Sequence, residues 1–113
     1  MIVLLSDDLI FSSKVAATGR AGGIDVAVAR STTELNSLIA QRSSIRVIVD
    51  LAFPGLVIGD LTKSPNHPRI IAYGPHVDAA LLRSAREAGC ALVLTRQQFV
   101  DRLEAELAEW CRP

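Results

Sequence analysis

Short apolar runs alternate with segments of helical periodicity along the whole chain of 113 residues. Such alternation is typical of βαβ units built around a parallel sheet. Five apolar runs predict the strands, at residues 2–5, 24–28, 45–49, 69–73 and 91–94. The chain shows no internal repeat and no low-complexity linker, so residues 1–113 are interpreted as a single domain.

The second and third runs predict different positions in the sheet. In residues 24–28, apolar Ile24, Val26 and Val28 alternate with Asp25 and Ala27, which indicates a half-exposed edge strand. Residues 45–49 are almost continuously apolar, as expected for a central strand covered on both faces.

Helical patterns fill the gaps between these runs. Residues 8–20 place Phe11, Val15 and Thr18 on one side, and Ser31 with Glu34 forms a capping box that opens the next helix. Two later helices are predicted at residues 77–88 and 97–110. In the last one Trp110 is assigned to the core stripe, in preference to an exposed anchor.

Proline and glycine interrupt the segment between residues 51 and 68, which leaves room for one short helix near residues 59–64. Five strands with right-handed crossovers predict a doubly wound, flavodoxin-like α/β domain with helices on both faces and a shortened third helix. The expected strand order is 2-1-3-4-5, in which ligands bind beyond the carboxyl ends of strands one and three. The residues just after Leu5 and Val49 are therefore the first place to look for a site.

Composition narrows the classes of partner. Twelve basic and twelve acidic residues give a formal net charge of zero, whereas nucleic-acid binders carry a basic excess, so we expect no nucleic-acid partner. The apolar start at residues 2–5 is too short for a membrane span or a signal peptide. Cys90 and Cys111 offer no disulfide framework and no metal-binding spacing, which predicts a cytoplasmic chain with ordinary thiols.

Acidic residues follow the two strands that meet at the switch point. Asp7 and Asp8 come after the first strand, and Asp50 comes after the third. Carboxylates that converge at one sheet edge form a hard-oxygen site suited to Mg²⁺. A carboxylate at such a site can also accept a phosphoryl group.

At these residues the chain resembles the receiver domain of two-component response regulators, the acceptors of phosphorelay signalling. Asp7 and Asp8 match the acidic pair of that family, and residues 50–55 resemble its segment from the phosphoacceptor Asp to a Pro four residues on. The resemblance implies that Asp50 is the phosphoacceptor and that Asp7, Asp8 and Asp50 hold Mg²⁺. The backbone carbonyl of Ala52 would complete the protein ligands of the ion.

The chain departs from that family at its switch residues. Receivers have a Ser or Thr hydroxyl at the end of strand four, where this chain has Gly74. They also have a Lys after strand five, where this chain has Arg96 preceded by Thr95. Arginine keeps the charge, but its planar fork is not equivalent to an ammonium group. Together with the shortened third helix, these departures predict a degenerate receiver, or pseudo-receiver.

Simpler interpretations stay open at each position. Asp7 and Asp8 could only cap the first helix, and Asp50 could only form a salt bridge with Arg96. His76 could contact a ligand at the same edge, but we favour the polar start of a helix.

The favoured function is a stand-alone signalling module that acts through protein–protein interaction. Its partner would be a kinase or an output protein, or a second copy bound through the last two helices, a surface that receivers use for dimerisation. The alternative is a small-ligand or metal-binding domain without phosphotransfer. No nucleophile–base pair is visible in the sequence, so we do not expect an enzyme.

Overall fold

A computed structural model describes residues 1–42, 45–66 and 68–110, so Cys111 lies outside the described residues. The described strands form one parallel sheet in the order β2-β1-β3-β4-β5, which confirms the predicted topology. The strands are β1 (Ile2–Leu5), β2 (Val26–Ala29), β3 (Arg46–Asp50), β4 (Arg69–Gly74) and β5 (Leu92–Thr95).

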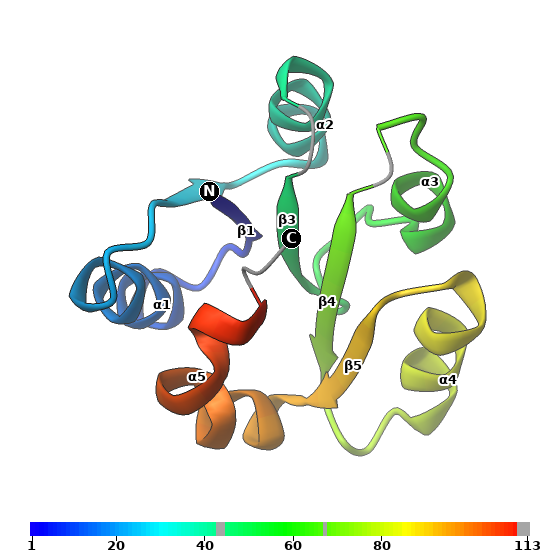
Figure 1. Cartoon of the computed structure of the whole chain (residues 1–113). Coiled ribbons are helices and arrows are strands. Elements are labelled where there is room, and N and C mark those ends of the chain that lie inside the picture. Colours follow the sequence, from blue (N-terminus) through cyan, green and yellow to red (C-terminus); the bar gives the residue numbers. More distant parts are fainter. Residues whose placement is uncertain (43–44, 67, 111–113) are drawn as a thin grey trace.

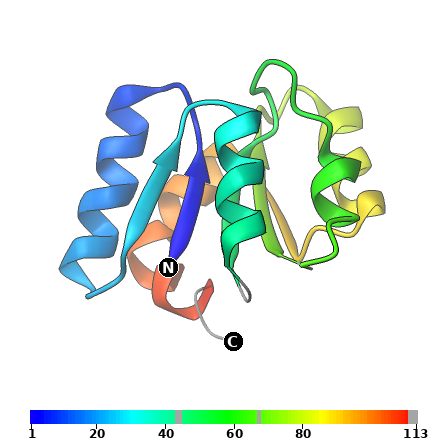
Figure 2. The same cartoon turned by 90° about the horizontal axis from the view of Figure 1, so that it is seen from above.

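Helices cover both faces of this sheet, as Figures 1 and 2 show. One face carries α1 (Leu9–Ala21) and α5 (Arg96–Trp110). The other carries α2 (Thr32–Gln41), α3 (Ile58–Thr62) and α4 (Ala79–Ala88). The five residues of α3 confirm the shortened third helix. Among the described residues, no helix combines the length and the apolar character that a membrane span requires.

Each face of the sheet has its own apolar core. The face under α1 and α5 gathers the aromatic side chains, and Trp110 stacks on Phe99 with 5.2 Å between the ring centroids. Trp110 is only 4% exposed, which confirms its assignment to the core stripe. The opposite face is filled by aliphatic side chains from β1, β3 and α2–α4.

The edge position of β2 is confirmed, although the strand begins at Val26, two residues later than predicted. Helix α1 approaches this strand through Gly19, where an added Cβ would lie 2.5 Å from Val26 Cγ2. Gly19 is therefore the buried residue on that side of the helix. Thr18, predicted on the same side of the helix as Phe11 and Val15, is half-buried, and its hydroxyl donates to the Lys14 carbonyl at 2.9 Å.

The last three strands each extend one residue further than the apolar runs predict, because polar or small residues continue the ladder. In this register Asp50 lies opposite Tyr73, and Gly74 lies opposite Thr95. Successive residues of a strand point to opposite faces. Asp50 and Tyr73 therefore share the face of α1 and α5, while Gly74 and Thr95 belong to the other face.

Candidate functional site

A row of polar side chains ends the apolar face beneath α1 and α5. Leu5 pairs with Val49, so Ser6 follows opposite Asp50, and Asp50 in turn pairs with Tyr73. All three side chains are buried, with relative exposures of 0% for Ser6, 9% for Asp50 and 1% for Tyr73. The sheet register thus brings two hydroxyl groups beside the predicted phosphoacceptor.

Asp50 lines a pocket, and one of its carboxylate oxygens is hydrogen-bonded. Its Oδ1 accepts a hydrogen bond from the Ala52 N–H at 2.9 Å, and no described residue donates to the other oxygen. Burial raises the pKa of Asp50, an effect that the Ala52 N–H and the charge of Arg96 partly offset. The pocket has a volume of about 140 Å³ and is lined by Asp50, Ala52, Tyr73, Gly74, Pro75 and Arg96.

Asp8 has both carboxylate oxygens engaged. Its Oδ1 accepts from the Phe11 N–H at 3.0 Å, which makes Asp8 the N-cap of α1. Its Oδ2 accepts from Arg96 Nη2 at 2.8 Å, and these two contacts lower the pKa of Asp8. The proposed capping role is therefore confirmed for Asp8.

The alternative salt bridge between Asp50 and Arg96 was wrong, since the described ion pair of Arg96 is with Asp8. The guanidinium carbon of Arg96 lies 4.7 Å from the centroid of the Phe11 ring, a cation–π contact that draws this side chain toward α1. Arg96 nevertheless lines the Asp50 pocket, and its charge acts on both carboxylates.

The predicted magnesium ligands do not form a ready ion site in this arrangement. Within residues 1–42, 45–66 and 68–110, no three acidic, histidine or cysteine side chains gather closely enough to hold a metal ion. Asp7 is exposed, and Arg96 already compensates the charge of Asp8. Binding of Mg²⁺ by Asp7, Asp8, Asp50 and the Ala52 carbonyl therefore remains a prediction, one that requires Arg96 to leave Asp8.

The backbone of Gly74 lines the Asp50 pocket, but a side chain at position 74, like that of Thr95, belongs to the opposite face of the sheet from Asp50. A Cβ on Gly74 would lie 3.4 Å from both Leu51 Cβ and Leu82 Cδ2, in apolar surroundings. Thr95 starts α5 by a reciprocal capping box: the Thr95 N–H donates to Gln98 Oε1 at 2.9 Å, and the Gln98 N–H donates to Thr95 Oγ1 at 3.1 Å.

His76 is exposed in the turn between β4 and α4. The N-cap of α4 is Asp78, whose Oδ1 accepts from the Leu81 N–H at 3.0 Å. His76 thus lies at the polar start of a helix, the interpretation that the sequence favours. It also borders a shallow depression together with Pro75 and Arg96, next to the Asp50 pocket.

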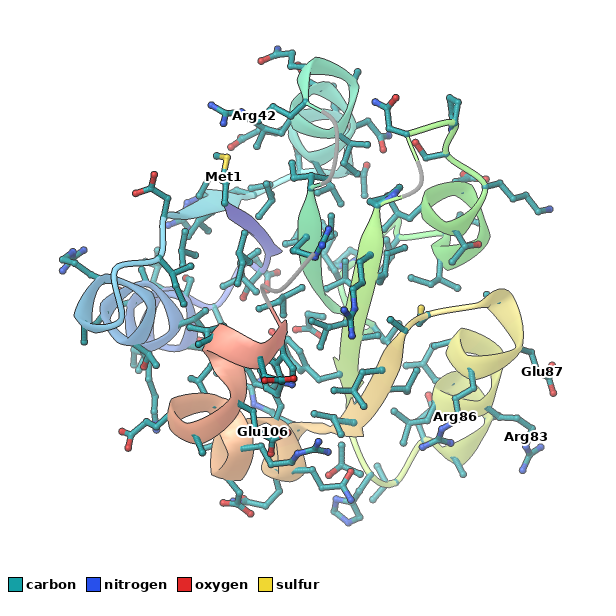
Figure 3. All side chains as sticks on the ribbon, viewed as in Figure 1. Met1, Arg42, Arg83, Arg86, Glu87 and Glu106 are labelled. Atoms are coloured by element: carbon teal, nitrogen blue, oxygen red, sulfur yellow. The ribbon has the colours of Figure 1, made fainter. Side chains whose placement is uncertain are left out.

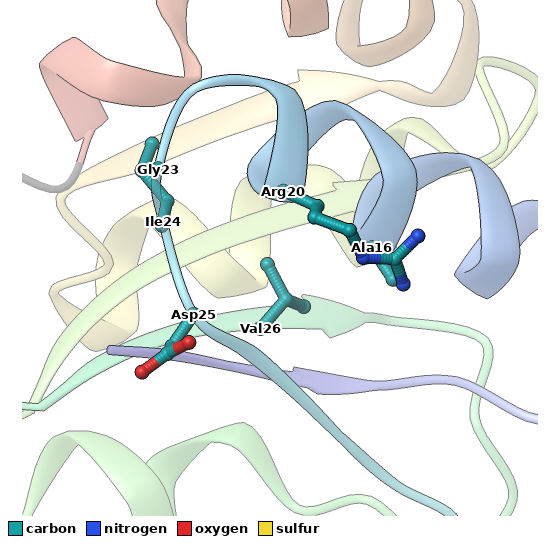
Figure 4. Close-up of a pocket in the computed structure, with 6 residues that line it drawn as sticks. All are labelled: Ala16, Arg20, Gly23, Ile24, Asp25 and Val26. Carbon is teal, nitrogen blue, oxygen red and sulfur yellow. The ribbon is translucent and has the colours of Figure 1, made fainter.

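A larger pocket, of about 280 Å³, lies between α1 and the start of β2. Figure 4 shows its lining residues, with the Arg20 guanidinium and the Asp25 carboxylate pointing to different sides. Polar groups that converge on a ligand are the mark of a binding site, and this pocket has none. We therefore place the candidate site at the smaller pocket beside Asp50.

Tyr73 is the site residue that the sequence interpretation missed. It is the only tyrosine of the chain, and burial raises the pKa of its hydroxyl, as does the Asp50 carboxylate. A signal was available, because the period of two in β4 puts Tyr73 on the same face as Ile71. Reading that period together with the expected register would have placed Tyr73 beside Asp50.

Comparison with known proteins identifies the fold. No protein-family model matches the sequence, and no curated protein does. Solved structures match closely. NtrX from Brucella abortus superposes with a TM-score of 0.81 at 17% identity over 97% of this chain, which spans only 26% of NtrX.

Two further structures are matched over nearly their whole length. CheY4 of Vibrio cholerae, a chemotaxis response regulator, has a TM-score of 0.79 at 15% identity, with 96% of each chain covered. The beryllofluoride-activated NtrC4 receiver domain dimer has a TM-score of 0.76 at 14% identity, covering 96% of this chain and 97% of that one. This chain therefore has the flavodoxin-like α/β fold of response-regulator receiver domains.

Proposed function

We propose that this chain is a receiver-like signalling module in which Asp50 accepts a phosphoryl group and a partner protein responds to the change. The observation that carries the proposal is the geometry of Asp50. Its carboxylate ends the central strand β3 and lines a pocket that Arg96 also lines, with one of its two oxygens accepting a hydrogen bond from the Ala52 N–H. This pocket lies at the carboxyl ends of β3 and β4, the edge of a parallel α/β sheet at which ligands bind.

The chemistry requires only the second carboxylate oxygen of Asp50 and a phosphoryl donor. The free carboxylate oxygen of Asp50 attacks the phosphorus of the donor, so that a new O–P bond forms. The bond between phosphorus and the donor group breaks, and the donor group leaves with the electron pair. The phosphoryl group adds negative charge beside Arg96. Its oxygens then compete with the Asp8 carboxylate for the guanidinium group.

The readout differs from that of a typical receiver. Gly74 has no hydroxyl to contact the phosphoryl group, and Arg96 stands where the resemblance expects Lys. We infer that the signal is the transfer of Arg96 from Asp8 to the phosphoryl group. Asp8 caps α1, and Arg96 is the first residue of α5. The transfer therefore breaks the ion pair that links the N-terminal ends of these two helices.

Exposed apolar side chains support a protein partner at this edge. Leu9 and Ile10 lie in the first turn of α1, while Val57 and Val77 lie in the loops after β3 and β4. All four follow the carboxyl ends of strands, as Asp50 does, and each is more than half exposed. Exposed apolar side chains at the same end of the sheet as Asp50 give a protein partner apolar surface to bury. We infer that a kinase or an output protein docks here.

Intact-mass measurement tests the proposal. Incubation with acetyl phosphate, with and without Mg²⁺, should add one phosphoryl group to the wild-type chain and none to Asp50→Asn. The control Asp25→Asn, an exposed residue outside the pocket, should be labelled like the wild type. A wild-type mass that stays constant under both conditions rejects phosphotransfer and leaves a pseudo-receiver that binds a protein partner, or a small-ligand domain, as the function.

A further inference from the structure

The hydroxyl of Tyr73 is buried and unpaired. Its oxygen is shielded from solvent and has no hydrogen-bond partner among the described residues. A buried tyrosine usually places its hydroxyl against a partner, because an unsatisfied polar group costs free energy. Nothing in the apolar core requires this oxygen, since phenylalanine would fill the same space.

The ring of Tyr73 is fixed by its neighbours. Its centroid lies 4.9 Å from that of Phe11 and 4.8 Å from that of Phe99, so helices α1 and α5 both hold it. A ring packed on two sides has little freedom to turn its hydroxyl elsewhere. The packing of the ring therefore fixes the position of the unpaired Tyr73 hydroxyl oxygen.

The groups around this hydroxyl are those of the candidate site. Tyr73 pairs with Asp50 across the sheet and lines the same pocket. The charges of Asp50, Arg96 and Asp8 all act on the pKa of the Tyr73 hydroxyl, which places it among these groups. The Ser6 hydroxyl is also close enough to lower that pKa, although the two oxygens do not meet in hydrogen-bonding geometry.

The ion pair between Arg96 and Asp8 lies just beyond this row of residues. Asp8 is two residues past Ser6, and Arg96 is two residues past Leu94, which pairs with Tyr73. The pair therefore crosses the end of the row from α5 to α1. Movement of Arg96 toward a phosphoryl group on Asp50 would open the space next to the Tyr73 hydroxyl.

We propose that the Tyr73 hydroxyl donates a hydrogen bond to a phosphoryl oxygen on Asp50, and so takes the role of the hydroxyl that Gly74 lacks. Position 74 itself points at Leu51 and Leu82 on the opposite face, whereas position 73 shares the face of Asp50. The inference rests on the proposed function of Asp50, and it makes Tyr73 a binding residue for the anionic group.

Tyr73→Phe tests this inference by removing one oxygen. Because the hydroxyl is unpaired in the resting chain, the variant should unfold at the same temperature as the wild type or higher. Its affinity for fluoroberyllate, a non-covalent phosphoryl mimic, should fall about tenfold in the presence of Mg²⁺, the usual loss for a hydrogen bond to a charged group. Phe99→Leu, which changes the packing around the ring without touching a hydroxyl, serves as the control.

The single tyrosine gives a second readout. In the chain labelled with ¹³C at the tyrosine ring, fluoroberyllate should shift the one Cζ resonance, and Asp50→Asn should abolish the shift. Equal mimic affinity in the wild type and Tyr73→Phe, with a Cζ resonance that does not move, overturns the role of Tyr73 and leaves Asp50 phosphorylation intact. A lowered melting temperature with unchanged affinity would identify a structural hydrogen bond to Ser6 and overturn it too. Failure of the wild type to bind the mimic or accept a phosphoryl group overturns the proposed function and this role together.

Discussion

At the scale of single residues, the weakness of the Arg96–Asp8 contact matters more than its geometry. Both side chains are well exposed, at 46% and 39%, and exposed ion pairs contribute little to stability. The capping bond from the Phe11 N–H engages the other carboxylate oxygen of Asp8 and does not depend on Arg96. Asp8 can therefore lose Arg96 and keep its cap, so that a new anion or cation can compete for either partner.

Removing the guanidinium should favour cation binding. In Arg96→Ala the Oδ2 of Asp8 is no longer engaged, so we expect calorimetry to show tighter Mg²⁺ binding than in the wild type, by about tenfold for one charge removed beside the site. The control is Arg102→Ala, which breaks the Arg102–Glu106 pair on the same helix. Equal Mg²⁺ affinity in all three chains would contradict the competition between Arg96 and a cation.

The buried Asp50 carboxylate should make stability depend on pH. Its raised pKa in the folded chain means that the contribution of Asp50 to stability is greatest when it is protonated, below its unfolded pKa, and is lost as pH rises through the folded pKa. Asp50→Asn should therefore raise the unfolding free energy at pH 7 by about 1 kcal/mol, the low end for relief of a buried charge. Thermal melts should show this gain shrinking as pH falls toward the unfolded pKa.

Asp8 should contribute to the pH dependence of stability with the opposite sign, which the same thermal melts can measure. Its pKa is lowered by the Phe11 N–H and by Arg96, so its contribution is present above the unfolded pKa and is lost as pH falls through the folded pKa. Asp8→Asn should thus show its largest difference from the wild type at neutral pH, with the opposite sign to Asp50→Asn. Two variants that shift the melting temperature in the same direction at pH 7 would contradict the burial argument.

At the scale of elements, the caps show what the sequence could and could not predict. The Ser31 cap is confirmed, with its Oγ accepting from the Glu34 N–H at 3.1 Å. The same motif at Thr95 and Gln98 was missed, because Thr95 also ends a strand and was assigned to the site. Period and capping thus predicted the elements and their order, while residues shared by two elements could be assigned only from the structure.

The candidate site was predictable to the same extent. Strand order and the position of Asp50 at the carboxyl end of the third strand follow from the apolar pattern, because the carboxyl ends of parallel strands meet at one edge. The partner of Arg96 does not follow, since Asp8 lies 88 residues away and Asp50 is an equally acidic alternative. The contact between the Arg96 guanidinium and the Phe11 ring favours Asp8 over Asp50 as the partner of Arg96. No local sequence motif predicts such a side-chain contact.

The contact between α1 and β2 should be sensitive to one methyl group. In Gly19→Ala the new Cβ would lie 2.5 Å from Val26 Cγ2 and 3.1 Å from the Ile24 carbonyl oxygen, so the helix must move away from the strand. We expect a loss of about 1–3 kcal/mol, which exceeds the roughly 1 kcal/mol that alanine gains over glycine in a helix. Urea denaturation measures the difference.

Gly59→Ala is the matched control, because Gly59 lies in α3 with no atom near its Cβ position. Without a steric penalty, the helix propensity of alanine should raise stability by up to about 1 kcal/mol. Opposite signs for the two substitutions support close packing of α1 on β2. If both substitutions stabilise the protein, α1 packs less closely on β2 than the structure shows.

At the scale of the whole molecule, zero net charge leaves little repulsion between copies. Helices α4 and α5 flank the edge strand β5 on opposite faces of the sheet. Figure 3 shows Arg83, Arg86 and Glu87 projecting from α4 and Glu106 on α5. The exposed face of α5 is acidic, with Asp101 and Glu104, so an α4 from one copy can face an α5 from another in a two-fold contact.

This surface should associate when Asp50 is modified. We expect sedimentation velocity to show a monomer–dimer shift on addition of acetyl phosphate, because Arg96, the first residue of α5, then leaves Asp8. The double variant Arg83→Glu and Arg86→Glu places like charges against the acidic face of α5 and should stay monomeric. Arg42→Glu, at the C-cap of α2 and at a distance from α4 (Figure 3), should dimerise like the wild type. Dimers that persist in the double variant would exclude α4 from the interface, and the exposed apolar side chains after the carboxyl ends of the strands would then be tested, starting with Ile10→Asp.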